Sequence, residues 1–462
     1  MDAALRALNR FGLGARPGER GQLRDPRGWL RAQLAGDPPI AAAPAIATPT
    51  AISDAIRAFR MPAQANRRQR TQAQPPQQAQ PPQPRQQARR RLVEIAGAES
   101  LAALETRITS ERPFVERLVA FWSNHLCVST AAKVLVVPLA GSYERDVIRP
   151  HVLGRFEDMV LASAKHPAML VYLDNFQSIG PTSRGAARRR GRGARGLNEN
   201  YARELLELHT VGVNGGYAQQ DVEEFAKTLT GWTVTGLQDG GPVIGFAFQS
   251  VLHEPGARTV LGVRYPEGGV AQGERAIHDL CTHASTARFI ATKLVTHFVA
   301  DAPPAAAVDR VARIFRSSDG DLRAVAAALI DVQEAWSDET RKFRTPQDWL
   351  VAALRAFGAR EIGQMTVPAL RQLRHPLWAP QSPKGFGDSV QEWADPDSLL
   401  NRAELARTLA GRLRANRIEP RDFLEVVDVS EKDPLRALLS DTSIAPPDRL
   451  ALAIAGPAFQ WR

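Results

Sequence analysis

Hydrophobic residues recur along most of the chain at spacings of three and four positions, which is the pattern of amphipathic helices. The clearest case is residues 196–232, GLNENYARELLELHTVGVNGGYAQQDVEEFAKTLTGW. This stretch predicts a helix, a glycine-rich turn and a second helix. Gly212 follows the first helix and suits a left-handed C-terminal stop. Because the turn is short, we expect the two helices to pack as antiparallel neighbours.

A single polar stripe marks the first of these helices. Asn198 suits its N-cap, because an asparagine side chain accepts hydrogen bonds from free amides of the first turn. Most of the circumference is apolar, so we expect the helix to be well buried and its charged side chains to need partners. At about 100° per residue, the stripe comprises Asn200, Arg203, Glu204 and Glu207.

The stripe has two interpretations. Two carboxylates one turn apart repel each other, so one pKa should rise unless Arg203 compensates. Glu204 and Glu207 would then bind a divalent metal or act as acid–base groups. Alternatively, Arg203 and the two glutamates form a structural ion-pair network, which perturbs carboxylates equally well. The residues alone slightly favour the structural network.

Three further polar residues lie at the ends of predicted elements. His125 closes an apolar helical stripe, where a histidine is more often a packed core residue, but histidine is also the commonest adjustable acid–base group. Asp174 ends a helix whose dipole disfavours an acid, so it caps the next segment or has a partner. His253 precedes the predicted turn, where it would be either a ligand or an exposed turn histidine.

The rest of the chain predicts a mainly α fold without a dividing linker, hence one large domain over residues 1–462. Residues 243–263 alternate and contain β-branched residues, which predicts one β-hairpin turning at residues 254–256. The segment HPLWAPQSPKGFGDSVQEW is aromatic and rich in Pro and Gly, and we expect an ordered loop that packs on the body. Further helices are predicted at residues 2–9, 26–34, 53–59, 92–110, 110–124, 142–148, 156–164, 167–174, 273–281, 286–299, 308–315, 322–330, 346–357, 398–413 and 446–455.

Two basic segments interrupt the helical pattern. Residues 60–91 are a Gln/Pro/Arg tract with eight arginines, and residues 184–195 are an Arg/Gly tract with six, neither containing an acid. Both compositions predict disordered inserts. Without them the net charge falls from +10 to 10 − 14 = −4. Neither tract interleaves aromatic residues for stacking on bases, so solvated inserts are favoured over nucleic-acid tethers.

Several functional classes lack their sequence signals. There is no phosphate loop, GxSxG, HExxH or GxGxxG motif, and His278, His283 and His297 do not have the spacing of a helical zinc pair. Cys127 and Cys281 form no disulfide or metal pattern. No stretch approaches the roughly 20 apolar residues of a membrane helix. The N-terminus also lacks signal-peptide features, so we expect a cytoplasmic protein.

Several stretches together resemble one bacterial family. They are ALNRFGLGARPGE, the 196–232 stretch, FWSNHLCVS, HPAMLVYLDN, HASTARFIATKLVTHFVAD, KFRTPQDWLVAALRAFG, PLWAPQSPKGFGD and the closing GPAFQWR. The chain thereby resembles the "domain of unknown function 1800" family over nearly its whole length. The resemblance implies a mostly helical fold and, in many members, export from the cytoplasm. It also implies genomic proximity to a second family that resembles phosphatases and sulfatases.

Three functional hypotheses follow. The first is an enzyme, hydrolytic or metal-assisted, with Glu204, Glu207, Arg203 and His125 as catalytic residues and Asn198, Asn200, Asp174 and His253 as substrate-binding residues. The second is a helical scaffold that acts with a separately encoded partner of the phosphatase/sulfatase-like family. The third, nucleic-acid binding through the basic inserts, is the least supported.

Overall fold

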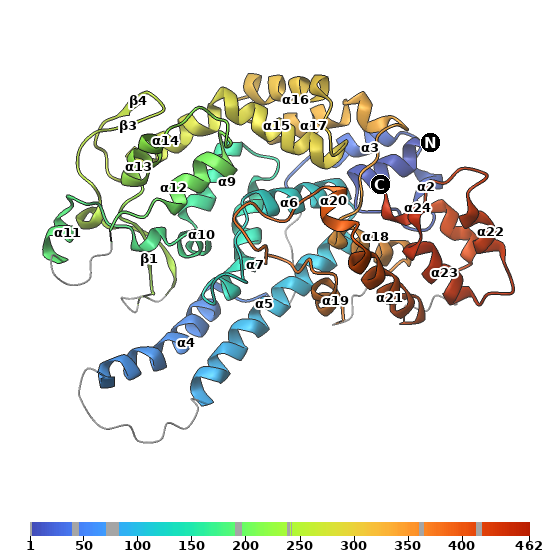
Figure 1. Ribbon diagram of the computed structural model, residues 1–462, viewed down its shortest axis with the longest axis horizontal. Helices are drawn as coiled ribbons and strands as arrows, with labels where there is room; N and C mark the ends of the chain where they lie inside the picture. The colour runs from blue at the N-terminus through green and yellow to red at the C-terminus, as the bar shows by residue number, and fades with distance from the viewer. Residues whose placement is uncertain are drawn as a thin grey trace.

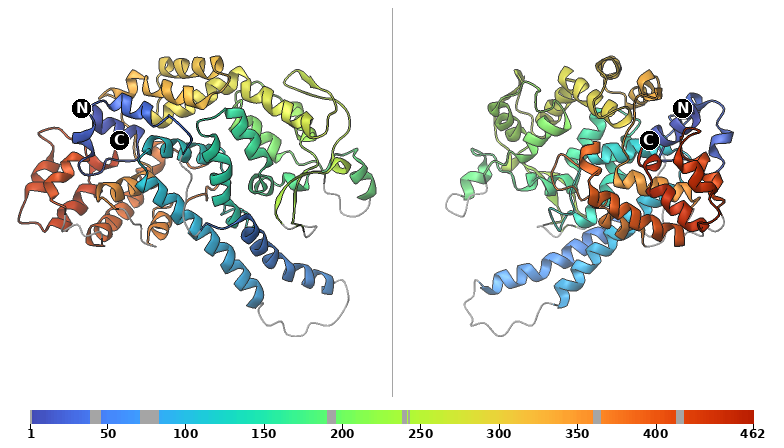
Figure 2. Two further views of the ribbon diagram at one scale, coloured as in Figure 1. Left: turned by 180° about the vertical axis from the view of Figure 1, so that it is seen from behind. Right: turned by 45° about the vertical axis from the view of Figure 1, so that its right-hand side comes forward.

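The computed structural model describes residues 2–38, 46–70, 83–189, 196–237, 241, 243–359, 365–412 and 418–462. The protein is mainly α, as predicted, with helices arranged in a broad arc and one long helical hairpin projecting from it (Figure 1). The two ends of the chain lie near each other in both views of Figure 2.

The N- and C-terminal segments are held together by backbone and side-chain hydrogen bonds. The N-terminal group comprises α1 (Ala3–Arg6), the π-helical turn η1 (Ala7–Phe11), α2 (Glu19–Gln22) and α3 (Pro26–Ala32). The C-terminal group comprises α21 (Pro396–Arg412), η9 (Pro420–Glu425), α22 (Pro434–Ser440), α23 (Pro446–Ala455) and α24 (Pro457–Gln460). Arg462 exchanges two backbone hydrogen bonds with Lys342 and donates from Nη1 to the carbonyl of Arg10. These contacts hold the two terminal segments against each other.

The projecting hairpin consists of α4 (Pro49–Arg70) and α5 (Gln83–Thr109) (Figure 1). Residues 60–70 and 83–91 of the segment predicted as an insert are helical. Ala, Gln and Arg are strong helix formers, a preference that a composition rule for disorder overlooks. Residues 71–82 lie outside the described part of the chain.

The second predicted insert is also partly helical. Residues 184–189 form α11 (Arg184–Arg189), and the Ser183 hydroxyl accepts a hydrogen bond from the amide of Ala186. A hydrogen bond of this kind caps the first turn and stabilises a short helix, although the glycine and arginine content of the segment predicts flexibility. Residues 190–195 lie outside the described residues.

The signature stretch forms the predicted pair of helices. The first helix is α12 (Asn200–Glu204), which widens into the π-helical turn η5 (Leu205–His209), and the second is α13 (Gln219–Thr228). Gly212 has a φ of 83°, the left-handed conformation expected of a helix stop. Short π-helical turns inside helices occur frequently at functional sites.

The β structure differs from the single predicted hairpin. β1 (Trp232–Thr235) pairs antiparallel with β2 (Gly245–Phe248), and β3 (Arg258–Val260) pairs antiparallel with β4 (Val263–Tyr265). The second hairpin turns at Leu261 and Gly262, which both have positive φ, rather than at residues 254–256. Two consecutive residues with positive φ make the tight turn whose twist matches paired strands.

The remaining helices surround the centre of the arc. The central set comprises α6 (Pro113–His125), η2 (Val137–Leu139), α7 (Ala140–Tyr143), the π-helical turn η3 (Glu144–Ile148), α8 (Arg149–His151), α9 (Phe156–Lys165), α10 (Pro167–Tyr172) and η4 (Asn175–Gln177). The later set comprises η6 (Ser250–Leu252), α14 (Val270–Thr282), α15 (Ala284–Phe298), α16 (Ala305–Ser317), α17 (Leu322–Ile330), η7 (Gln333–Trp336), α18 (Pro346–Ala356), α19 (Thr366–Gln372) and α20 (Val390–Trp393). Helices α9, α14 to α18 and α23 agree with the prediction to within three residues at each end.

A buried carboxylate organises the centre of the molecule. Glu144, on η3, accepts hydrogen bonds from Arg107 (2.7 Å), Ser123 (3.0 Å) and the indole of Trp378 (2.8 Å). Burial alone would raise the pKa of Glu144, but Arg107 and Arg149 hold the pKa below its usual value. The carboxylate of Glu144 therefore links α5, α6, η3 and the loop around Trp378 through hydrogen bonds.

A second buried ion pair extends this network. Arg149 binds both carboxylate oxygens of Glu116, at 2.7 and 2.8 Å, and its guanidinium also lies 3.5 Å from Glu144. Bidentate geometry of this kind compensates the desolvation of both charges.

We predict that Arg149→Met destabilises the protein by about 3–5 kcal/mol, because Glu116 is then left charged and buried without its partner. Chemical denaturation measures the loss. Arg288→Met is the matched control, since Arg288 pairs with Asp309 on the surface and should cost less than about 1 kcal/mol. Equal, small losses in both variants would contradict the role given to the buried pair.

Candidate functional site

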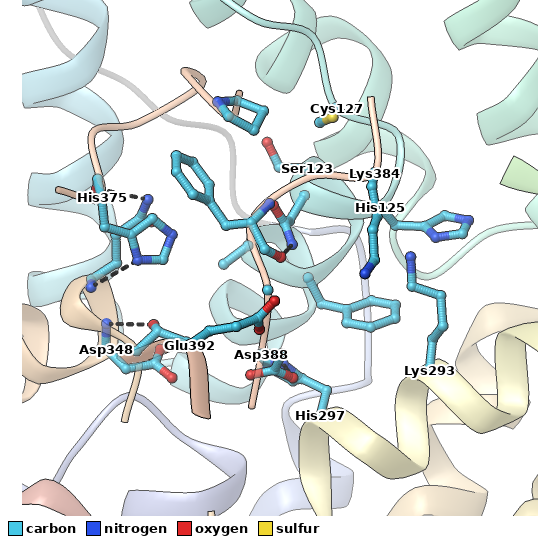
Figure 3. Close-up of a pocket in the computed structure, with 18 of the residues that line it drawn as sticks. Ser123, His125, Cys127, Lys293, His297, Asp348, His375, Lys384, Asp388 and Glu392 are labelled. Atoms are coloured by element: carbon cyan, nitrogen blue, oxygen red, sulfur yellow. Dashed lines mark hydrogen bonds and ion pairs between the residues drawn. The ribbon is translucent and has the colours of Figure 1, made fainter. Parts of the chain in front are cut away.

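A cavity of about 370 Å³ opens between α6, α15, the start of α18 and the loop that leads to α20 (Figure 3). Its volume is at the small end of the range for ligand pockets. Helices supply much of its wall, so the side chains that face it are held on rigid elements. The polar and ionisable lining includes Arg107, Ser123, Asn124, His125, Cys127, Lys293, His297, Gln347, Asp348, His375, Lys384, Asp388, Ser389 and Glu392.

The loop over the cavity is ordered and packed on the body, as its composition predicts. The Asn124 side chain donates to the carbonyl of Phe386 and accepts from its amide, both at 2.8 Å. At Gly385 a β-carbon would lie 2.5 Å from the backbone oxygen of Asn124, so only glycine allows this approach. Trp378 has a φ of 51°, which is strained for a bulky residue. Such strain persists only where surrounding contacts impose it, and it clusters at functional sites.

A histidine–carboxylate pair lies at one end of the cavity. Nδ1 of His297 lies 2.7 Å from a carboxylate oxygen of Asp388, while its Nε2 is buried without a hydrogen-bond partner among the described residues. Burial lowers the pKa of His297, although Asp388 opposes the shift. The neutral ring therefore donates from Nδ1 and leaves Nε2 as a free acceptor. Lys342 lies behind the pair and donates to the Asp388 carbonyl.

Lys293 lies one turn before His297 on α15, so both side chains project from the same face of the helix. Its ammonium group lies 5.6 Å from the ring centroid of Phe289. The pKa of Lys293 is lowered to about 8: burial is the main cause and the charge of Lys384 contributes, while Cys127 and Asp388 oppose the shift. In Figure 3 the Lys293 side chain extends toward Lys384 and the ring of His125.

Two other ionisable groups of the lining are Asp348, which is paired with arginines, and His375, which is neutral. Asp348 lies 3.0 Å from Arg117 and 3.3 Å from Arg462, and these cations hold its pKa well below the usual range although burial opposes the shift. His375 stacks on Trp393 with ring centroids 4.7 Å apart, and burial lowers its pKa to about 3. His375 is therefore a neutral, largely apolar part of the wall.

His125 is the predicted site residue that the structure places in the cavity lining. Its Nε2 lies 3.1 Å from the carbonyl of His209, at the end of the signature helix. Its Nδ1 is buried and has no partner among the described residues. Burial, followed by the charge of Lys293, keeps the pKa of His125 well below its usual value. The signature helix thus contributes to the site by fixing the orientation of His125.

The predicted polar stripe is half-buried rather than well buried, and Arg203 is paired within its own helix. Arg203 lies 3.2 Å from Glu199 and 3.4 Å from Glu207, both one turn away, and also donates to Gln219 on α13. For Arg203 and Glu207, these contacts correspond to the structural ion-pair network that the sequence offered as the alternative to a catalytic role. Exposed pairs of this type contribute little stability, about 0.3–0.5 kcal/mol each.

Glu204 differs from its neighbours in the stripe. Among the described residues, no hydrogen bond or ion pair involves its carboxylate. Burial raises the pKa of Glu204, and the charge of Glu207 adds to this effect while Arg203 opposes it. Its charge also raises the pKa of Cys127, which lines the cavity. Glu204 therefore lies near the cavity without being part of the lining.

The four predicted substrate-binding residues do not converge on the cavity. Asn198 accepts from the amide of Asn200 and donates to a carbonyl on α10's end, and Asn200 itself is exposed. Asp174 has a φ of 61° and precedes η4 without a side-chain capping hydrogen bond. It pairs with Lys133, so of the two alternatives the structure shows the partner and not the cap that the sequence favoured. His253 is buried against the β1–β2 hairpin, with Nδ1 2.9 Å from the Thr230 carbonyl, so the exposed alternative is wrong.

Lys293, Lys384 and Asp388 were not predicted as site residues, and His297 was weighed only as a zinc ligand. A weak signal is present in the sequence: a lysine within an apolar helix, followed by a histidine four residues later. The loop sequence SPKGFGD places a lysine and an aspartate in an ordered segment. Only the fold reveals that these two stretches meet, because about ninety residues separate them in the sequence.

Two further predictions concern metals and membranes. Within the described ranges, no three His, Cys, Asp or Glu side chains come together in a group that would hold a metal ion. The divalent metal considered for Glu204 and Glu207 therefore has no such ligand set there. None of the described helices combines the length and apolar character needed to cross a bilayer.

The sequence profile of a family described as "Protein of unknown function (DUF1800)" matches residues 6–461. The chain belongs to this family. The match spans almost the whole chain, which confirms the resemblance of the separate motifs. No curated protein and no solved structure matches significantly. The family description names no activity, so the function has to be argued from the site.

We predict that Glu204→Gln leaves the protein at least as stable as the wild type at pH 7. A raised carboxyl pKa means that the folded state binds the proton more tightly than the unfolded chain, so ionisation at neutral pH reduces stability. The advantage of glutamine should vanish below about pH 4, where both states are protonated. Thermal unfolding at both pH values measures this. Glu207→Gln is the control, with a small loss; a large loss in Glu204→Gln at pH 7 would contradict the assignment.

Proposed function

We propose that the protein is an enzyme that acts on a small substrate in the cavity, with Lys293 as a reactive amine. His125 and the His297–Asp388 pair transfer protons beside it. The observation that carries this proposal is an amine that lines a cavity and has no ion-pair partner among the described residues. The same cavity wall contains two histidines, each with a free ring nitrogen.

Lys293 is exceptional among the lysines of the chain. The four other lysines that are at least partly buried each pair with a carboxylate, namely Lys133, Lys165, Lys227 and Lys342. No carboxylate lies within ion-pair distance of Lys293 among the described residues. An unpaired charge away from water is costly, so a lysine in such a place favours its neutral form. A structural role would have supplied a partner.

A partly neutral lysine is a nucleophile and a base near neutral pH. An unperturbed lysine has a pKa of about 10.4 and is almost entirely protonated at pH 8. With a pKa of about 8, half of the Lys293 side chains are neutral at that pH. Desolvation and a neighbouring cation are the usual means of activating a lysine, and burial and Lys384 provide both here.

The two histidines are suited to receive and return protons. Because His125 donates from Nε2 to the His209 carbonyl, its Nδ1 is the free acceptor; in His297 the free acceptor is Nε2. Each ring is fixed by a hydrogen bond on its other nitrogen, which sets the tautomer as in other acid–base sites. Asp388 is the positioning residue for His297.

We predict that p-nitrophenyl acetate, a probe for reactive amines, acylates Lys293 preferentially. The rate of p-nitrophenol release should follow the neutral fraction of the amine and rise with pH to a plateau, with a midpoint near 8. Stopped-flow absorbance measures the rate, and peptide mass spectrometry locates the acetyl group. Lys293→Met should lose this phase, and His125→Gln should slow it by about tenfold or more.

Lys165→Met is the matched control, because Lys165 is an ion-paired lysine away from the cavity lining. It should react like the wild type. Lys293→Met should also unfold at a temperature equal to or above that of the wild type, since methionine fills the site without a charge. Acetylation spread evenly over surface lysines, or a midpoint near 10, would refute the proposal.

A further inference from the structure

We propose that the substrate is a small carbonyl compound that carries a carboxylate, an oxo acid, and that Lys293 binds its carbonyl carbon covalently as an imine. This inference rests on the proposed function, because it uses the same amine. It adds the substrate class and the nature of the intermediate.

The two lysines that line the cavity, Lys293 and Lys384, support a substrate that carries a carboxylate. Lys384 lies in the loop over the cavity, is exposed, and has no carboxylate partner among the described residues. In Figure 3 its side chain extends toward that of Lys293. Among the acidic groups of the lining, Asp348 is bound by Arg117 and Arg462 and Asp388 by His297. Glu392 accepts hydrogen bonds from the amide and the hydroxyl of Ser389. None of the three lies within ion-pair distance of Lys293 or Lys384 among the described residues. A ligand carboxylate would therefore find Lys384 unoccupied beside the amine of Lys293.

The remaining wall favours a compact, partly apolar ligand. Phe121, Leu377 and Phe386 line the cavity together with the aromatic face of Trp378. A cavity of about 370 Å³ with these walls accepts a small organic acid more readily than a polymer segment. Aromatic walls also limit the water that would hydrolyse an imine before it reacts.

A covalent role fits the protonation states better than simple binding of an anion. A site built only to hold an oxyanion would keep Lys293 charged, yet burial and Lys384 both favour the neutral amine. The two histidines are also neutral, and each presents an acceptor nitrogen rather than a second positive charge. These groups are arranged to remove protons from an amine, which imine formation requires and anion binding does not.

The chemical step balances without any further reactant. The lone pair of the neutral Lys293 nitrogen attacks the carbonyl carbon, forming a C–N bond while the carbonyl π electrons move to oxygen. The nitrogen loses one proton to a histidine, His125 or His297, which passes it to the oxygen and so gives a neutral carbinolamine. The nitrogen lone pair then forms the C=N bond and expels hydroxide, which takes the second N–H proton through the same histidine and leaves as water. Amine and carbonyl thus give imine and water, with no oxidation or reduction.

Reductive trapping tests the inference. The full-length protein is incubated with pyruvate and sodium cyanoborohydride, which reduces an imine to a stable secondary amine, and its peptides are then analysed by mass spectrometry. We expect one saturable adduct on Lys293, with the mass of pyruvate less one oxygen atom, and none in Lys293→Met. Labelling confined to exposed lysines, without saturation, would overturn the inference.

A second variant tests the carboxylate. Lys384→Met keeps the amine, and we expect it to raise the pyruvate concentration for half-maximal labelling by about tenfold, the loss expected for one charge-assisted contact. Because the variant also removes a charge that lowers the pKa of Lys293, labelling by acetaldehyde, which has no carboxylate, should change too, but by less than labelling by pyruvate. If Lys384→Met changes labelling by the two reagents equally, the oxo acid is the wrong class.

The outcomes separate this inference from the proposed function. If p-nitrophenyl acetate acetylates Lys293 with a midpoint near 8 but pyruvate leaves no adduct, the imine is refuted and the reactive amine stands. If neither reagent modifies Lys293, both are refuted. Stabilisation by inorganic phosphate equal to that by pyruvate, again without an adduct, would show an oxyanion site and overturn the inference.

Discussion

The fold depends on how the carboxylate of Glu144 is compensated inside the protein. Arg107, Ser123 and Trp378 reach this group from three separate stretches of the chain, and Arg149 links it to Glu116. Removing a buried charge from water is expensive, so such a network forms only when all partners are in place. The same contacts fix the end of α6 and the loop around Trp378, which are two walls of the cavity. The network therefore positions the candidate site as well as stabilising the core.

The charges of this core network are paired, whereas the cavity contains a lysine that has no ion-pair partner among the described residues. Asp348 and Asp388 in its wall are paired with Arg117, Arg462 and Lys342, whereas Lys293 has no carboxylate partner among the described residues. Proteins tolerate an unfavourable arrangement of this kind where function requires it, at some loss of stability. The strained backbone of Trp378 in the same wall is a second departure from local preference at the same place.

Local patterns in the sequence predict most helices but fewer of the site residues. Helix α15 follows from its apolar periodicity alone, and the stop at Gly212 follows from glycine's access to positive φ. The β3–β4 turn at Leu261 and Gly262 was missed because leucine rarely adopts positive φ, and pairing between strands overrides that preference. His125 was named as a candidate from its position at the end of an apolar stripe. Lys293 and Asp388, which line the same cavity, were not, because only long-range packing brings these residues to one place.

The signature stretch contacts the rest of the protein in two ways. Arg203 pairs along its own helix, whereas the backbone carbonyl of His209 accepts a hydrogen bond from His125, which lines the cavity. Both proposals require that the amine of Lys293 be partly neutral at physiological pH. An NMR titration of protein labelled with ¹³C-lysine measures this, with the Lys293 ε-methylene signal assigned by its loss in Lys293→Met. We expect a titration midpoint of about 8. A midpoint of about 10.4, the value of an unperturbed lysine, would contradict both proposals.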